Sequence, residues 1–375
     1  MKQLMLHEFH HGLGANFFEL NDAEIVSDYG DWLAEYKSLR ENAGVLDFSF
    51  RSRICLIGAD RIRFLHGQIT NDVKKLRVGE GCYAAITTNK GKMESDLNVF
   101  NLLDELLLDF EPGLTKKISA RLEKFIVADD VQIVDVRPHY GLLSVQGQKS
   151  AAVIRALNLF PQIPEKQFGS VKISDATLGE IYLANNARLS NWWGERPREP
   201  QTNQFGFDLF IPNHSLGAVV DKLIAAAKQI GGRAVGWTAF ETMRIENGIP
   251  QFGADMDETN IPLECGIENR AIVYNKGCYI GQEVINRIHS IGHVNRELRA
   301  LRLATNLETL PKKGDKLFRD GKEIGYVTSA VRSPMFGNIA LGYVRREANQ
   351  IGTELVLKTT SGESPVKIVE LPFAK

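Results

Sequence analysis

From Asn295 onward the chain reads as short strands at close spacing, and this stretch constrains the fold more than any other. Leu317-Phe318 and Ile324–Thr328 flank Asp320-Gly321, a dipeptide typical of a two-residue hairpin turn. Further strands are expected at residues 339–344, 354–358 and 366–371. Short strands that follow one another so closely predict a small β-barrel or sandwich.

The rest of the chain mixes helical and strand patterns. Apolar residues at helical spacing predict helices over 31–41, 114–125, 216–230 and 237–247. Strands are expected at 54–58, 131–136, 140–146 and 284–288, and Asp60 is expected to cap a helix after the first of these. The predicted fold class is therefore α+β, a multi-domain body followed by the C-terminal barrel.

Composition limits the classes of function. The chain has 375 residues, 43% hydrophobic and 24% charged, which is ordinary for a globular protein of two or three domains. A formal net charge of −1 provides no global field for nucleic acid or an anionic membrane. The four cysteines form no Cys-x-x-Cys pair and no apolar run reaches about 18 residues, so we expect a cytoplasmic protein without a metal site.

A β-hairpin over residues 81–100 carries the first candidate functional residue. Residues 81–87 and 93–100 are expected strands, joined by the turn Thr88-Asn89-Lys90-Gly91-Lys92. Asp96 follows just after this turn. Without further information, Asp96 could be a solvated aspartate on a strand face, a turn cap or a carboxylate that faces a ligand.

The second candidate is the stretch Lys276-Gly277-Cys278-Tyr279-Ile280-Gly281-Gln282-Glu283. It has no apolar periodicity, and its glycines allow a ligand to approach the backbone, so we expect a functional loop. Lys276 could favour the thiolate of Cys278, the reactive form of cysteine. A small buried apolar residue is the alternative for Cys278, as it is for any free cysteine.

The stretch 276–283 resembles the signature of the YgfZ family, folate-binding relatives of the glycine-cleavage T-protein (aminomethyltransferase). The hairpin at 81–100 and the run Arg244-Ile245-Glu246-Asn247-Gly248 resemble T-protein motifs as well. The resemblance implies that Cys278 and Asp96 are the catalytic residues. It also implies a set of folate-binding residues, namely Asp96, Phe240, Arg244, Glu246, Gln204 and Gln282.

Two departures separate this chain from the T-protein. The T-protein typically has no cysteine at the position of Cys278, and Gln204 stands where it has a glutamate directed at the pterin. The resemblance therefore implies, first, a YgfZ-like tetrahydrofolate-binding protein that supports iron–sulfur cluster assembly or repair and, through it, tRNA modification. A T-protein-like aminomethyltransferase that passes a one-carbon unit to tetrahydrofolate is the first alternative, and a non-enzymatic partner-binding scaffold is the second.

The resemblance also implies the chain's organisation and partners. We expect an N-terminal extension over 1–40, folate-binding modules over 41–147 and 148–294, and the barrel over 295–375. The expected cofactor is tetrahydrofolate or a one-carbon-substituted folate. Iron–sulfur client or assembly proteins are the expected partners, with no direct contact to nucleic acid or membrane.

Overall fold

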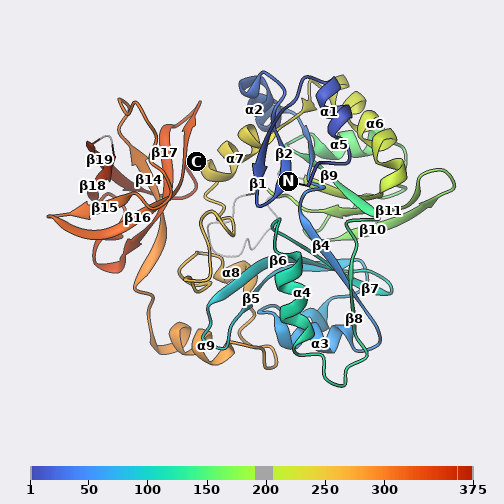
Figure 1. Ribbon diagram of the computed structural model, residues 1–375, viewed down its shortest axis with the longest axis horizontal. Coiled ribbons are helices and arrows are strands. Elements are labelled where there is room, and N and C mark those ends of the chain that lie inside the picture. Colours follow the sequence, from blue (N-terminus) through green and yellow to red (C-terminus); the bar gives the residue numbers. More distant parts are fainter. Residues whose placement is uncertain (1, 191–205, 361, 374–375) are drawn as a thin grey trace. The chain divides into compact units, whose positions relative to one another are not determined.

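The computed structural model describes residues 2–190, 206–360 and 362–373 (Figure 1). These residues form two compact units. The first unit contains residues 2–84, 96–190 and 206–240, and the second contains residues 85–95, 241–360 and 362–373. The second unit thus takes in the turn of the predicted hairpin, far upstream of its other residues. Among the described residues, no helix is both long and apolar enough to cross a membrane.

A six-stranded sheet forms the largest part of the first unit. Its strand order is β10-β11-β12-β9-β3-β13, with bounds Ser170–Asp175, Gly179–Asn185, Gly206–Pro212, Tyr140–Gln146, Gly44–Asp47 and Arg233–Ala234. Helices α5 (Ser150–Ala156) and α6 (Leu216–Gln229) pack side by side against this sheet (Figure 1). The buried face of α6 includes Val219, Leu223 and Ala227, whose spacing is the helical periodicity that the sequence shows.

A five-stranded sheet carries the predicted hairpin. Its order is β5-β6-β7-β4-β8, with bounds Glu80–Thr87, Met93–Asn101, Glu105–Phe110, Ser52–Ile57 and Gln132–Asp135. Helix α3 (Arg61–Gln68) contacts β7, and helix α4 (Thr115–Glu123) contacts β4 and β8. The Asp60 side chain does not cap α3, contrary to our expectation, because its carboxylate accepts the backbone N–H of Asp130 at 2.9 Å.

The chain before residue 44 forms short elements in the first unit. They are α1 (His7–Gly12), the two-stranded sheet β1–β2 (Asn16–Leu20 and Ala23–Asp28) and α2 (Trp32–Glu41). Asp31 caps α2 through its side chain, which accepts the Ala34 N–H at 3.1 Å. The helix expected at 31–41 is confirmed by this element.

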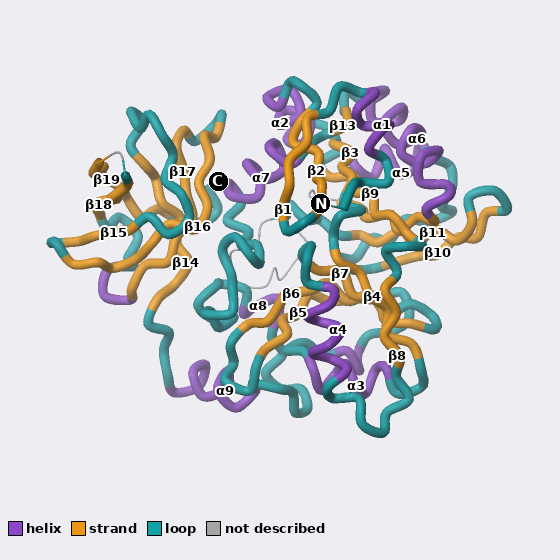
Figure 2. Tube along the Cα trace, in the orientation of Figure 1, coloured by secondary structure: helices purple, strands orange, loops and turns teal. Residues whose placement is uncertain are grey.

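The second unit ends in a closed six-stranded barrel, seen as orange strands in Figure 2. Its order is β14-β17-β16-β15-β18-β19, with bounds Arg296–Leu303, Gly337–Arg345, Lys322–Ser333, Lys316–Arg319, Glu354–Thr359 and Gly362–Val369. Alternate residues such as Leu355 and Leu357 fill its core. Asp320 and Gly321 both have positive φ and close the β15–β16 hairpin, which confirms the turn expected there.

Three helices precede the barrel, namely α7 (Trp237–Glu246), α8 (Glu268–Ala271) and α9 (Gln282–Ile291). Helix α9 replaces the strand that we expected at 284–288. Val284, Ile285, Ile288 and Ile291 are spaced three and four apart, which is the period of a helix. Their β-branched side chains favour strands by propensity, and the helical period outweighs that preference.

Candidate functional site

Asp96 lies on β6, the returning strand of the hairpin, and its side chain is half-buried. The turn before it is closed by Gly91, whose φ is 70° and whose N–H donates to the Thr88 carbonyl at 2.9 Å. The hydroxyl of Tyr83, on the neighbouring strand β5, donates to Asp96 Oδ2 at 2.8 Å. The hairpin therefore fixes the carboxyl group through both its backbone and a neighbouring side chain.

The surroundings of Asp96 disfavour its charged form. Burial and, next, the negative charge of Glu111 raise the pKa of Asp96 to about 7, against the opposing effects of the Tyr83 hydrogen bond and the Arg51 charge. Arg51 Nη1 donates to Glu111 Oε1 at 2.5 Å, so these two groups are held together. A carboxyl group with this pKa can take up and release a proton near neutral pH.

A buried chain of ion pairs surrounds Arg51 in the first unit. Arg51 Nε donates to Asp109 Oδ1 at 2.8 Å. Arg188 Nη2 donates to Asp109 Oδ2 at 2.8 Å and also to Asp208 Oδ2 at 2.6 Å. Burial disfavours the charge of Asp109, but the two guanidinium groups outweigh it and hold its pKa well below its usual range. These pairs link β7 to β12 and fix the position of Arg51.

Phe240 lies in an aromatic cluster of the first unit. Its ring centroid is 5.1 Å from that of Phe48 and 5.4 Å from that of Trp237, and Phe50 lies 5.9 Å from Trp237. Phe240 itself is buried, whereas Trp237 is only half-buried. Trp237 is thus the member of the cluster whose ring remains partly open for stacking on a flat ligand.

The guanidinium of Arg244, on α7, is fully engaged within the second unit. It pairs with Glu241 through Nε and Nη2, at 2.7 and 2.6 Å, and with Asp255 through Nη1 at 2.6 Å. Its remaining donors reach the Ile249 carbonyl and the Ser329 hydroxyl. An arginine has five N–H donors, and all five have protein acceptors here. The arrangement stabilises the fold and leaves no donor for a ligand.

Glu246, the next candidate on α7, is fully buried in the second unit. Its Oε1 accepts the Ser333 hydroxyl at 2.5 Å, and its backbone carbonyl accepts the Phe373 N–H at 2.8 Å. Both contacts tie α7 to the barrel region. These positions give Glu246 a structural role in this unit.

The stretch 276–283 forms a loop up to Gly281, and α9 begins at Gln282. Gly281 has φ 90°, and a Cβ added there would lie 2.6 Å from both Thr87 Oγ1 and the Thr88 carbonyl oxygen. The Thr87 hydroxyl donates to the Ile280 carbonyl at 2.7 Å. Glycine at 281 therefore allows the loop to pack directly on the hairpin turn.

Cys278 is exposed in this loop, whereas Cys55, Cys82 and Cys265 are buried. The Lys276 side chain is buried, and its Nζ lies 5.0 Å from the ring centroid of Tyr279. Gln282 Nε2 is 3.5 Å from the Lys276 carbonyl, close to the limit of a hydrogen bond. The sulfur is thus accessible to reagents, and the effect of Lys276 on its ionisation stays a prediction.

Sequence patterns did not identify several of these neighbours. Glu111, Arg51 and Trp237 belong to segments distant from Asp96 in the sequence, and no local motif marks any of them. Long-range pairing of strands brings Glu111 and Arg51 near Asp96, and such pairing leaves no local trace in a sequence. Tyr83 lies on the first strand of the predicted hairpin, but its hydrogen bond to Asp96 was not predicted. Gln204, predicted to bind the folate, lies outside the described residues.

Comparison with known proteins decides the family. Residues 6–276 match the GCVT N-terminal domain, and residues 296–375 match the glycine cleavage T-protein C-terminal barrel domain. The chain belongs to the glycine cleavage T-protein family. The T-protein part of the resemblance is confirmed by these matches, as is the expected α+β multi-domain body with a C-terminal barrel.

Relatives of this T-protein family member share nearly its whole length. Two proteins named aminomethyltransferase, from Halalkalibacterium halodurans and Herpetosiphon aurantiacus, are each 27% identical to it. The first alignment covers 93% of this chain and 94% of the relative, and the second covers 100% and 99%. The fold is that of glycine cleavage system aminomethyltransferase T from Bartonella henselae, with a TM-score of 0.84 at 22% identity over 100% of this chain and 98% of that one.

Proposed function

We propose that the protein binds a tetrahydrofolate and transfers a one-carbon unit in an aminomethyltransferase-type reaction. The observation that carries the proposal is Asp96, a half-buried carboxyl group whose pKa is raised to about 7 by burial and by Glu111. Membership of the T-protein family and the relatives named aminomethyltransferase support the same choice.

The chemistry of the step explains why such a carboxyl group suits it. When bound, tetrahydrofolate supplies ring nitrogens that accept the one-carbon unit. A ring N–H that forms a bond to the carbon would lose its proton, and Asp96 can accept a hydrogen bond from that N–H and then the proton. The bond between the carbon and the lipoyl sulfur of the donor would break in the same step, and the departing thiolate would take up the proton. The Tyr83 hydroxyl, which donates to Asp96 Oδ2 at 2.8 Å, holds the carboxylate in place for this proton transfer.

The other predicted folate-binding residues differ in whether they could contact a bound folate. The half-buried Trp237, backed by Phe48 and Phe240, suits a flat aromatic ring. Arg244 does not suit the anionic glutamate tail, because each of its donors already has a protein acceptor. We therefore keep Asp96 and the aromatic cluster in the proposed folate site and assign Arg244 and Glu246 to the fold.

Cys278 favours a second candidate function, that of a YgfZ-like protein that supports iron–sulfur cluster assembly or repair. It is an exposed thiol in a loop whose sequence resembles the YgfZ signature. An aminomethyl transfer does not need a thiol at this position. In this candidate Cys278 acts as a nucleophile or a soft-metal ligand, and tetrahydrofolate binding is retained.

One pair of assays distinguishes the two candidates. Calorimetric titration with tetrahydrofolate measures binding, and a methylene-transfer assay with an aminomethyl-lipoyl carrier protein measures catalysis. Binding with transfer supports the proposed function, and binding without transfer supports the second candidate. If neither occurs, both are wrong, and a non-enzymatic scaffold is the remaining alternative.

A further inference from the structure

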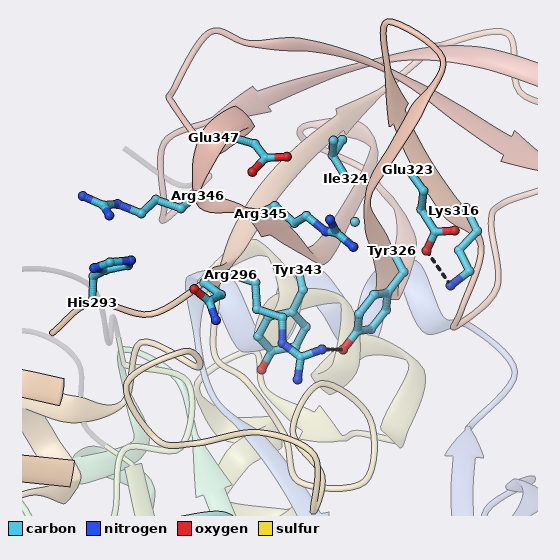
Figure 3. Close-up of a pocket in the computed structure, with 12 residues that line it drawn as sticks. His293, Arg296, Lys316, Glu323, Ile324, Tyr326, Tyr343, Arg345, Arg346 and Glu347 are labelled. Carbon is cyan, nitrogen blue, oxygen red and sulfur yellow. Dashed lines mark hydrogen bonds and ion pairs between the residues drawn. The ribbon is translucent and has the colours of Figure 1, made fainter. Parts of the chain in front are cut away.

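A cavity on the barrel side of the second unit has no part in the proposed reaction. Its volume is about 910 Å³, within the size range of small-molecule sites. All of its lining residues belong to the barrel and the segment just before it, and Figure 3 shows them as sticks on the strands and loops of this unit. Among them, Arg296, Lys316, Arg345 and Arg346 are cationic, whereas only Glu323 and Glu347 are acidic.

The two carboxylates in this cavity already have partners. Glu323 Oε1 lies 3.0 Å from Lys316 Nζ, and Glu347 Oε1 lies 2.6 Å from Nζ of Lys322. Each acid is thus offset by a lysine. The positive charges of Arg345 and Arg346 are left to dominate the field in the cavity, because Arg296 is paired with Glu264.

Arg296 forms a fixed part of the cavity wall. Its guanidinium lies 5.1 Å from the ring centroid of the buried Tyr343, and Nη1 donates to the Tyr326 hydroxyl at 3.1 Å. Its Nε pairs with Glu264 Oε1 at 3.3 Å. The two rings and Glu264 hold this cation in place, so that part of the wall is set before any ligand arrives.

Arg345 and Arg346 differ from Arg296 in that, among the described residues, no ring contact or ion pair fixes either side chain, although the Arg345 charge acts on the nearby Glu347 carboxylate. Both are exposed, and within the described ranges neither forms an ion pair. In Figure 3 the Arg345 side chain lies between Arg346 on one side and Tyr326 on the other. In Figure 3 the two side chains extend in opposite directions from neighbouring backbone positions, so a ligand that reaches both guanidinium groups must carry more than one oxyanion, each paired with the fork-shaped donors of one arginine.

We propose that this cavity is a second ligand site, which binds a small polyanion whose clustered phosphate or carboxylate groups pair with Arg345 and Arg346. Arg296, whose charge is paired with Glu264, forms a fixed part of the wall beside the same ligand. Phosphates and carboxylates both present oxygens in the geometry that a guanidinium group recognises. The structure therefore does not distinguish a phosphate ligand from a carboxylate ligand, and the test uses one probe of each kind. The site is independent of Asp96 and of the proposed transfer reaction.

The test is calorimetric titration of the full chain with inorganic pyrophosphate and, separately, with a tri-glutamate peptide. We expect at least one probe to bind, with an affinity that falls as salt is added. The double variant Arg345→Gln/Arg346→Gln should weaken that binding by about tenfold or more, the loss expected for removing charge-assisted hydrogen bonds. Binding of pyrophosphate identifies phosphate as the source, and binding of the peptide alone identifies carboxylate.

A matched control removes the same charge elsewhere on the barrel. Arg302 on β14 and Lys367 on β19 are exposed cross-strand neighbours that do not line the cavity. Arg302→Gln/Lys367→Gln should leave the affinity unchanged, and both variants should keep the wild-type melting temperature because all four side chains are exposed. The proposal is overturned if neither probe binds at about millimolar concentration, or if both variants lose affinity equally.

Discussion

Replacing Tyr83 by phenylalanine should raise the pKa of Asp96 further. The Tyr83 hydroxyl donates to Asp96 Oδ2 at 2.8 Å and so favours the ionised carboxylate against burial and the Glu111 charge. A hydrogen bond to a charged group contributes about 1.5–3 kcal/mol. At 1.36 kcal/mol per pKa unit, its loss corresponds to an upward shift of about one to two units from the value of about 7.

The same substitution should change how stability depends on pH. In the unfolded chain Asp96 titrates near pH 4, as an unperturbed aspartate does. Between about pH 4 and 7 the folded protein therefore holds a proton on Asp96 that the unfolded chain has lost, so its contribution to the unfolding free energy falls as pH rises through this window. Tyr83→Phe should extend that fall to higher pH.

Carbon-detected NMR titration of the Asp96 carboxyl group measures the pKa directly. Tyr182→Phe is the matched control, because Tyr182 packs against Tyr140 rather than Asp96. Glu111→Gln should shift the pKa of Asp96 downward, because it removes the negative charge that raises it. The reasoning is refuted if Tyr83→Phe leaves the Asp96 pKa unchanged or lowers it.

Three further predictions concern the second unit. Arg244→Met should destabilise the protein by about 3–5 kcal/mol in urea unfolding, because it leaves the buried Asp255 without its cation; a loss below about 0.5 kcal/mol would contradict the structural role. Gly281→Ala should destabilise more than Gly314→Ala, since both have positive φ but only the Cβ at 281 meets other atoms; equal losses would show that the loop contact is unimportant. Limiting alkylation followed by mass spectrometry should label Cys278 before the other three cysteines, which are buried, and simultaneous labelling would contradict its selective exposure.

Local patterns in the sequence were sufficient to predict the tight turns. The turn at residues 88–92 and the Asp320-Gly321 hairpin each form within a few residues, so turn chemistry alone predicts them. Helix α9 was not predicted, because its β-branched residues favour a strand locally while their spacing satisfies a helix. Where propensity and period disagreed, the period was the better guide.

The site was predictable only in part, for a related reason. Asp96 could be identified because its hairpin resembles a T-protein motif, but its acidity depends on Glu111 and Arg51, which reach it through the pairing of distant strands. Arg244 shows the converse case. Its motif suggested a ligand contact, whereas Asp255 and Glu241, close to it in sequence, take up its charge.

The most direct test of the proposed function is single-turnover transfer of a one-carbon unit to tetrahydrofolate by the wild-type protein and by Asp96→Asn. Asparagine keeps the shape of the side chain and an oxygen that can accept from Tyr83, but it cannot take up the proton. We predict that Asp96→Asn binds tetrahydrofolate in calorimetry and transfers about 10²–10⁴-fold more slowly, the usual contribution of a general base. Transfer by Asp96→Asn at the wild-type rate would contradict the central role of this carboxyl group.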